Sequence, residues 1–166
     1  MKVSHLVVMV LLAGLTAMLV GMGPSETPGE AKVDSKEWKA VERAVLDYCE
    51  AFYEMKPEYL ERSVHPNLNK FGYYRTAADQ PYRKVYADFD GLYDLAKVWN
   101  KDGHFGPDAK KTVEVFEVLD QTAAAKLVGE WGIDYLHLAK IKGKWMIVQV
   151  LWQTPPIADA SGADKR

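Results

Sequence analysis

Asp134 and Gln149 are polar residues in a C-terminal segment whose other residues are mostly apolar. The pair Lys142–Gly143 is typical of a two-residue hairpin loop, which predicts that Ile141 pairs with Lys144. Counting back along the two strands places Asp134 and Gln149 on one face of the hairpin, among leucines and isoleucine.

A buried carboxylate or amide needs hydrogen-bonding partners, and such groups gather in ligand pockets and catalytic sites. Asp134 is therefore the best catalytic candidate, as a general base, and Asp134 and Gln149 are both candidate ligand contacts. The alternative is a structural role, in which Asp134 caps a neighbouring loop or pairs with a basic side chain.

Tyr48 and His65 complete the set of candidate ligand contacts. Tyr48 falls on the apolar side of a predicted helix, where we expect its hydroxyl to point into the same cavity. The alternative is a core tyrosine bonded to the backbone. His65 stands before Pro66 at a predicted helix end, where capping or packing is the alternative to ligand binding. Cys49, the only cysteine, lies beside the apolar stripe of the first helix, which predicts a buried, unreactive thiol.

Other classes of site find no support in the sequence. It has no HExxH, paired CxxC or EF-hand spacing and no glycine-rich phosphate loop, so we expect neither a metal nor a cofactor. The formal net charge is −2, and no basic run is longer than a pair such as Lys110–Lys111. This charge pattern argues against a nucleic-acid partner.

Helices are expected in the first part of the folded segment. Apolar residues at spacings of three and four predict a helix that is capped by Asp34 or Ser35 and ends at Pro57. Its apolar stripe consists of Trp38, Val41, Val45, Tyr48 and Phe52. The next expected elements are a short helix from Pro57 to His65, an irregular segment over 67–81, a short strand at Val85–Asp88 and a helix from Asp90 to Gly103.

Strands are expected after the helices. Residues 112–119, 122–141 and 144–153 are rich in β-branched and aromatic residues, which predicts three consecutive antiparallel strands. This order predicts an α+β fold with helices on one face of an antiparallel sheet. The last hairpin is apolar on both faces, so its outer face also needs a cover. That outer set is Ile133, Tyr135, His137, Met146, Val148, Val150 and Trp152, and it predicts a homodimer through the outer sheet face.

The N-terminal residues have the order of a secretory leader. Lys2 is followed by the uncharged apolar run Leu6–Val20 and then by small residues. We expect a signal peptide over 1–22, a flexible linker over 23–33, the folded domain over 34–154 and a disordered tail over 155–166. The protein is then exported, periplasmic or secreted, with no membrane contact once the leader is cleaved. Retention of the leader as an anchor is the alternative.

The segment from Glu130 to Gln153 resembles the closing hairpin of the nuclear transport factor 2-like superfamily. The similarity rests on Asp134–Tyr135–Leu136, on Lys-Gly-Lys-Trp at the turn, and on Ile147 and Trp152. It is strongest to the branch called putative lumazine-binding, related to the SnoaL-like proteins, and covers about residues 36–153. The resemblance implies a cone-shaped α+β fold with N-terminal helices packed on a curved sheet around an apolar pocket, and dimers through the back of the sheet.

Three functions remain open on these grounds. The leading hypothesis is a pocket that binds a small apolar or aromatic ligand. The second is an enzyme of the isomerase or dehydratase kind that uses a carboxylate base, although the inner face offers no clear second acid. The third is a dimerisation module with a closed core.

Overall fold

A computed structural model describes residues 35–156 of the chain. The predicted signal peptide (1–22), the linker (23–33), the capping residue Asp34 and the tail beyond Pro156 lie outside the described residues. Among the residues described, no helix has both the length and the apolar character needed to cross a membrane.

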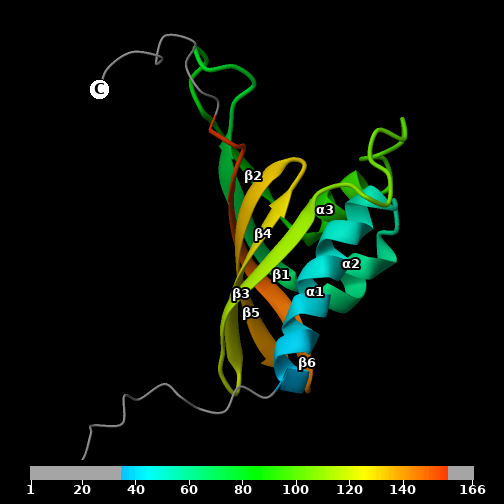
Figure 1. Cartoon of the computed structure of the whole chain (residues 1–166), viewed down its shortest axis with the longest axis vertical. Coiled ribbons are helices and arrows are strands. Elements are labelled where there is room, and N and C mark those ends of the chain that lie inside the picture. The colour runs from blue at the N-terminus through cyan, green and yellow to red at the C-terminus, as the bar shows by residue number, and fades with distance from the viewer. Residues whose placement is uncertain (1–34, 157–166) are drawn as a thin grey trace, which may run out of the picture. The chain divides into compact units, whose positions relative to one another are not determined.

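Three helices pack on one side of a six-stranded mixed sheet (Figure 1). The elements are α1 (Ser35–Tyr53), α2 (Glu58–Ser63), β1 (Val64–Tyr74), β2 (Arg83–Ala87), α3 (Phe89–Ala96), β3 (Lys111–Val118), β4 (Thr122–Gly129), β5 (Gly132–Ile141) and β6 (Lys144–Gln153). The strand order is β2-β1-β6-β5-β4-β3, in which β1 and β6 are parallel and the other neighbours antiparallel. The α+β class is confirmed, and the arrangement is that of a cone-shaped fold closed on one side by helices.

The amphipathic helix predicted from residue spacing is α1. Val41, Val45, Tyr48 and Phe52 of the predicted stripe are buried against the sheet, and Cys49 beside them is fully buried. Burial raises the pKa of the Cys49 thiol to about 12, so the thiolate is not available near neutral pH.

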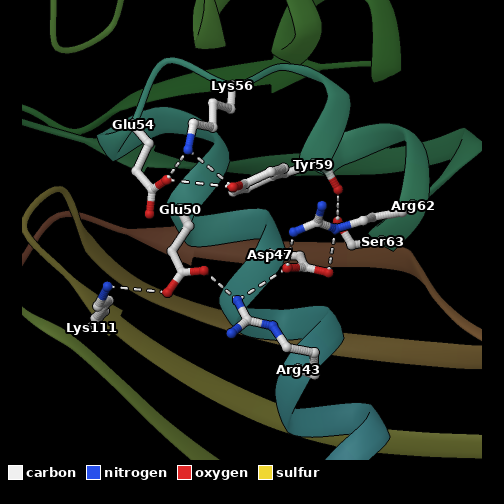
Figure 2. Close-up of polar contacts among 9 residues, drawn as sticks. All are labelled: Arg43, Asp47, Glu50, Glu54, Lys56, Tyr59, Arg62, Ser63 and Lys111. Carbon is white, nitrogen blue, oxygen red and sulfur yellow. Dashed lines mark hydrogen bonds and ion pairs between the residues drawn. The ribbon is translucent and has the colours of Figure 1, made fainter.

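A polar network on the far side of α1 fixes its neighbours (Figure 2). Asp47 lies between two arginines: Arg62 of α2 binds it through two bonds of 2.8 and 2.7 Å, and Arg43 approaches to 3.0 Å. Glu50, one turn further on, pairs with Arg43 and with Lys111 of β3 at 3.1 Å. These contacts tie α2 and β3 to the helix that carries Tyr48, the residue directly after Asp47.

The first strand was not predicted, because residues 67–81 were expected to be irregular. Pro66 disfavours a regular ladder, and it lies in a register break of β1 between Val64 and Asn69, where the missing N–H costs no ladder bond. The inward positions after Val64 hold Leu68, Lys70 and Gly72. A lysine and a glycine on the buried face hide the alternation that indicates a strand.

The segment predicted as one long strand over 122–141 is two strands joined at Glu130–Trp131. The strands close with Gly129 opposite Gly132. Gly132 has a φ of 145°, and a Cβ there would fall 2.1 Å from the carbonyl oxygen of Gln153. A glycine is therefore required, and the prediction of three strands was wrong because this tight turn was read as part of a strand.

The start of α3 also differs from the prediction. Its N-cap is Asp88, whose carboxylate accepts a 2.9 Å bond from the backbone N–H of Gly91, instead of Asp90. The helix ends at Ala96, and hydrogen-bonded turns carry the chain on to Gly103.

Candidate ligand-binding site

A cavity of about 110 Å³ lies between the helices and the sheet. Its wall is mainly aromatic and aliphatic, with side chains from α1, α3, the turn after α3, the β4–β5 turn and strands β1 and β6. The lining residues are Tyr48, Phe52, Lys70, Leu92, Leu95, Trp99, Trp131 and Trp152. Leu95 is 44% exposed, which places it at the mouth, whereas Leu92 is buried deeper.

The aromatic part of the wall is held by edge-to-face contacts. Trp131 packs edge-on against Phe52 at a centroid distance of 5.6 Å and against Trp99 at 5.5 Å. Trp152 packs directly against the backbone of β1 because Gly72 has no side chain. A Cβ at Gly72 would lie 2.3 Å from Cδ1 of Trp152. These rings create an apolar surface against which another ring can pack.

Lys70 is the charged residue of the wall. Its Nζ donates a hydrogen bond to the hydroxyl of Tyr48 and lies 3.5 Å from Oδ1 of Asp134. It also sits 5.3 Å from the ring centre of Trp152, within reach of a cation–π contact. The ammonium group therefore sits among aromatic rings with one carboxylate as its counterion.

Asp134 lies behind the wall and does not line the cavity. It is fully buried, and its Oδ2 accepts a 3.1 Å bond from Nε1 of Trp131. Oδ1 accepts no hydrogen bond among the residues described and faces Lys70 only as an ion pair. Asp134 thus positions Lys70 and Trp131, and a molecule in the cavity meets these two side chains first.

Burial shifts both titratable groups on the wall. It lowers the pKa of the Lys70 ammonium from its ordinary value near 10.5, an effect that the Asp134 carboxylate partly offsets. Burial, followed by the charge of Asp134, raises the pKa of the Tyr48 phenol well above 10.0. The phenol therefore stays protonated, and the amine gives up its proton more readily than a lysine in water.

Two of the four predicted ligand contacts come together here, and two do not. Tyr48 lines the cavity and Asp134 stands directly behind it. Gln149 lies on the opposite sheet face, where its Oε1 is 3.2 Å from Nδ1 of His137. His65 is outside the cavity wall, and its Nδ1 accepts a 3.1 Å bond from the backbone N–H of Asn67.

The error for Gln149 arises from a β-bulge. The turn has the predicted pairing of Ile141 with Lys144, with Lys142 and Gly143 at positive φ, but the register shifts between His137 and Leu138. Asp134 consequently pairs with Trp152 instead of Leu151. The shift moves Val150 and Trp152 to the inner face and Gln149 and Leu151 to the outer face.

A family model with the description "Putative lumazine-binding" matches residues 36–153. The chain belongs to this putative lumazine-binding family. No curated protein matches the chain significantly in sequence.

Solved structures agree with the fold of this member of the putative lumazine-binding family. An NTF2-like protein of unknown function from Silicibacter pomeroyi aligns with a TM-score of 0.58 and 16% identity, covering 73% of this chain and 98% of that one. A similar protein from Shewanella baltica gives 0.56 and 20%, with coverages of 75% and 98%. One from Methylobacillus flagellatus gives 0.57 and 19%, with 75% and 96%. At such identities, the likeness shows the NTF2-like fold alone.

Sequence reasoning missed Lys70, Trp131 and Trp152 as residues of the site. Lys70 lay in the segment read as irregular, and the bulge was needed to bring Trp152 inward. The available signal was Lys70 itself, the one charged residue of the stretch Leu68-Asn-Lys-Phe-Gly72. Within residues 36–156, no group of three or more histidine, cysteine or acidic side chains is placed to hold a metal ion.

Proposed function

We propose that this domain binds a small ring compound that carries one hydrogen-bond acceptor. The observation that carries the proposal is an aromatic cavity whose wall includes Lys70 and Tyr48, with the Lys70 ammonium group bonded to the Tyr48 hydroxyl. The rings supply the apolar contact, and Lys70 with Tyr48 supplies the polar contact that orients the ligand.

The size of the cavity limits the ligand to about one ring. A dry cavity of about 150 Å³ holds benzene in an engineered protein, so about 110 Å³ with an exposed mouth suits one ring whose substituent points outward or toward Lys70. The two fused rings of a lumazine are larger than this space. We therefore propose a ligand of about one ring instead of the lumazine that the family description names.

The acceptor requirement follows from the buried charge. A ligand without an acceptor leaves Nζ of Lys70 with the partners it already has, whereas a carbonyl oxygen adds one. Hydrogen bonds to a charged group contribute about 1.5–3 kcal/mol. Benzamide should therefore bind more tightly than toluene, which offers the same ring without the carbonyl.

Calorimetric titration with benzamide and toluene tests the proposal. Leu95→Trp places a larger side chain at the exposed mouth and should abolish binding of both compounds. Val98→Trp is the matched control, because Val98 is exposed one turn away and does not line the cavity. Binding that is absent in the native protein, or that survives Leu95→Trp unchanged, contradicts the proposal.

The homodimer also remains a proposal, with a corrected set of residues. A row of side chains crosses the outer face from Tyr86 through Phe71 and Leu151 to Tyr135. Tyr86, Leu151 and Tyr135 are exposed, and the rings of Phe71 and Tyr86 stack at 5.8 Å. A continuous apolar row of this kind is typical of a contact between copies. A sedimentation experiment that shows only monomer at micromolar concentration contradicts it.

Export is proposed from the leader pattern of Lys2 and Leu6–Val20. The expected result is that the mature protein, recovered from outside the cytoplasm, has lost about its first 22 residues by intact-mass measurement. A species that retains Met1 in that fraction contradicts cleavage and favours an anchor.

A further inference from the structure

Lys70 combines three features that a purely structural lysine does not need. Its side chain forms part of a cavity wall, its Nζ contacts the hydroxyl of Tyr48, and a carboxylate oxygen of Asp134 lies 3.5 Å away. A lysine that only balances Asp134 could be sealed from the cavity by its neighbours. Here the side chain of Lys70 forms part of the wall of a cavity of about 110 Å³.

Amines in apolar pockets react with carbonyl compounds because desolvation favours the neutral, nucleophilic form. The surroundings of Lys70 provide the other groups that such a reaction needs. Tyr48 is a protonated phenol in contact with the amine, and Asp134 is a fixed negative charge beside it. The rings of Trp131 and Trp152 offer a surface for the organic part of the substrate.

We propose that Lys70 captures a small aromatic aldehyde or ketone as a protonated imine, with Tyr48 transferring protons and Asp134 as the counterion. This inference rests on the proposed function, because the aromatic wall must first hold the ring. It adds a covalent step and a substrate class, carbonyl compounds of about one ring.

The step balances without an oxidant or a reductant. The Lys70 ammonium first releases a proton to solvent. The neutral amine attacks the carbonyl carbon, an N–C bond forms, and the C=O π electrons move to oxygen, which takes a proton from Tyr48. The nitrogen returns a proton to the Tyr48 phenolate. Tyr48 then donates a proton to the hydroxyl of the carbinolamine, which leaves as water while the nitrogen lone pair forms the C=N bond. The Tyr48 phenolate is finally reprotonated from solvent, which replaces the proton that the ammonium released at the start. Overall, one ammonium and one carbonyl compound give one protonated imine and one water.

Asp134 stabilises the product of this step in particular. A protonated imine keeps the positive charge at the position of Nζ, so the same ion pair persists after condensation. Burial keeps the pKa of Lys70 below its ordinary value, which raises the fraction of neutral amine that starts the reaction at neutral pH.

Reductive trapping with benzaldehyde and cyanoborohydride at neutral pH tests the proposal on the intact domain. The expected result is rapid addition of one benzyl group per chain, located at Lys70 by peptide mapping. Exposed lysines such as Lys97, whose pKa is raised by its hydrogen bond to Asp94, should react more slowly because they stay protonated. A benzyl group spread over exposed lysines, with none at Lys70, overturns the inference.

Two variants separate the covalent step from folding and from binding. Tyr48→Phe removes the proton donor and should slow trapping at Lys70 at least tenfold, whereas Val98→Trp, outside the cavity wall, should be trapped at the native rate. The pair Lys70→Met with Asp134→Asn removes both charges together and should abolish trapping. If benzamide binds and Lys70 is not trapped, the imine inference fails and the proposed function stands. If neither benzamide nor toluene binds the native protein, the proposed function fails as well.

Discussion

The buried ion pair of Lys70 and Asp134 makes a quantitative prediction about stability. The two side chains are 9% and 0% exposed and their charged atoms are 3.5 Å apart. At the effective dielectric constant of about 20 that suits protein sites, two unit charges at this distance attract by about 5 kcal/mol. Removing either partner strands the other charge in an apolar site, which typically costs about 3–5 kcal/mol.

A double-mutant cycle with Lys70→Met and Asp134→Asn measures this coupling. The asparagine oxygen can still accept the bond from Nε1 of Trp131, so the substitution removes mainly the charge. We expect each single variant to lower the free energy of unfolding by about 3–5 kcal/mol. The double variant should lose at least about 3 kcal/mol less than the sum of the two, because no stranded charge remains.

Urea unfolding followed by circular dichroism gives the four free energies. The surface pair of Lys126 and Glu114 is the matched control, since its charged atoms are closer, at 2.8 Å, but exposed to solvent. Solvent screening should make its coupling much smaller than that of the buried pair. Additive effects of Lys70→Met and Asp134→Asn, or equal couplings in the two cycles, would refute the electrostatic account of the site.

Three further predictions concern pH, packing and assembly. Folding lowers the pKa of Lys70, so between that pKa and about 10.4 the unfolded chain binds more protons than the folded protein. The free energy of unfolding should therefore rise with pH in this window in the native protein, and should not do so in the double variant. Urea titrations at several pH values measure this difference. Gly72→Ala should cost about 1–3 kcal/mol in thermal unfolding, because its Cβ would fall 2.1 Å from the carbonyl oxygen of Trp152; an unchanged midpoint contradicts the tight contact. Leu151→Lys should leave the fold intact and give monomers in sedimentation. Val150→Lys should unfold the domain, because Val150 is fully buried. The reverse result would mean that Val150 lies on the outer face, as the hairpin count from sequence predicted.

The elements with a strong local signal were predictable. The spacing of Val41, Val45, Tyr48 and Phe52 suffices for α1, because a helix of that length has to bury its one apolar stripe. Lys142–Gly143 likewise predicts the last turn, since both residues adopt the positive φ that a two-residue hairpin needs. The burial of Cys49 and Asp134 follows from their neighbours in these elements.

The β-bulge could not be read from the sequence. The extra residue is Val148 of β6, which lies between the partners of His137 and Leu138 and changes the face of every later residue of β6, and nothing in the local composition demands it. The hairpin count was therefore right near the turn and wrong at Gln149, Val150 and Trp152. A prediction based on alternation fails wherever a strand holds one unpaired residue.

Sequence alone determined the fold class and that one carboxylate, Asp134, would be buried, because both follow from patterns within single elements. Only the tertiary structure decided what that carboxylate faces. Lys70 comes near Asp134 because β1 runs parallel beside β6. These two segments are about 80 residues apart, and no pattern within either strand predicts that they pair. The site is therefore a product of strand order, and the free energy of its buried charges depends on a contact that no local pattern encodes.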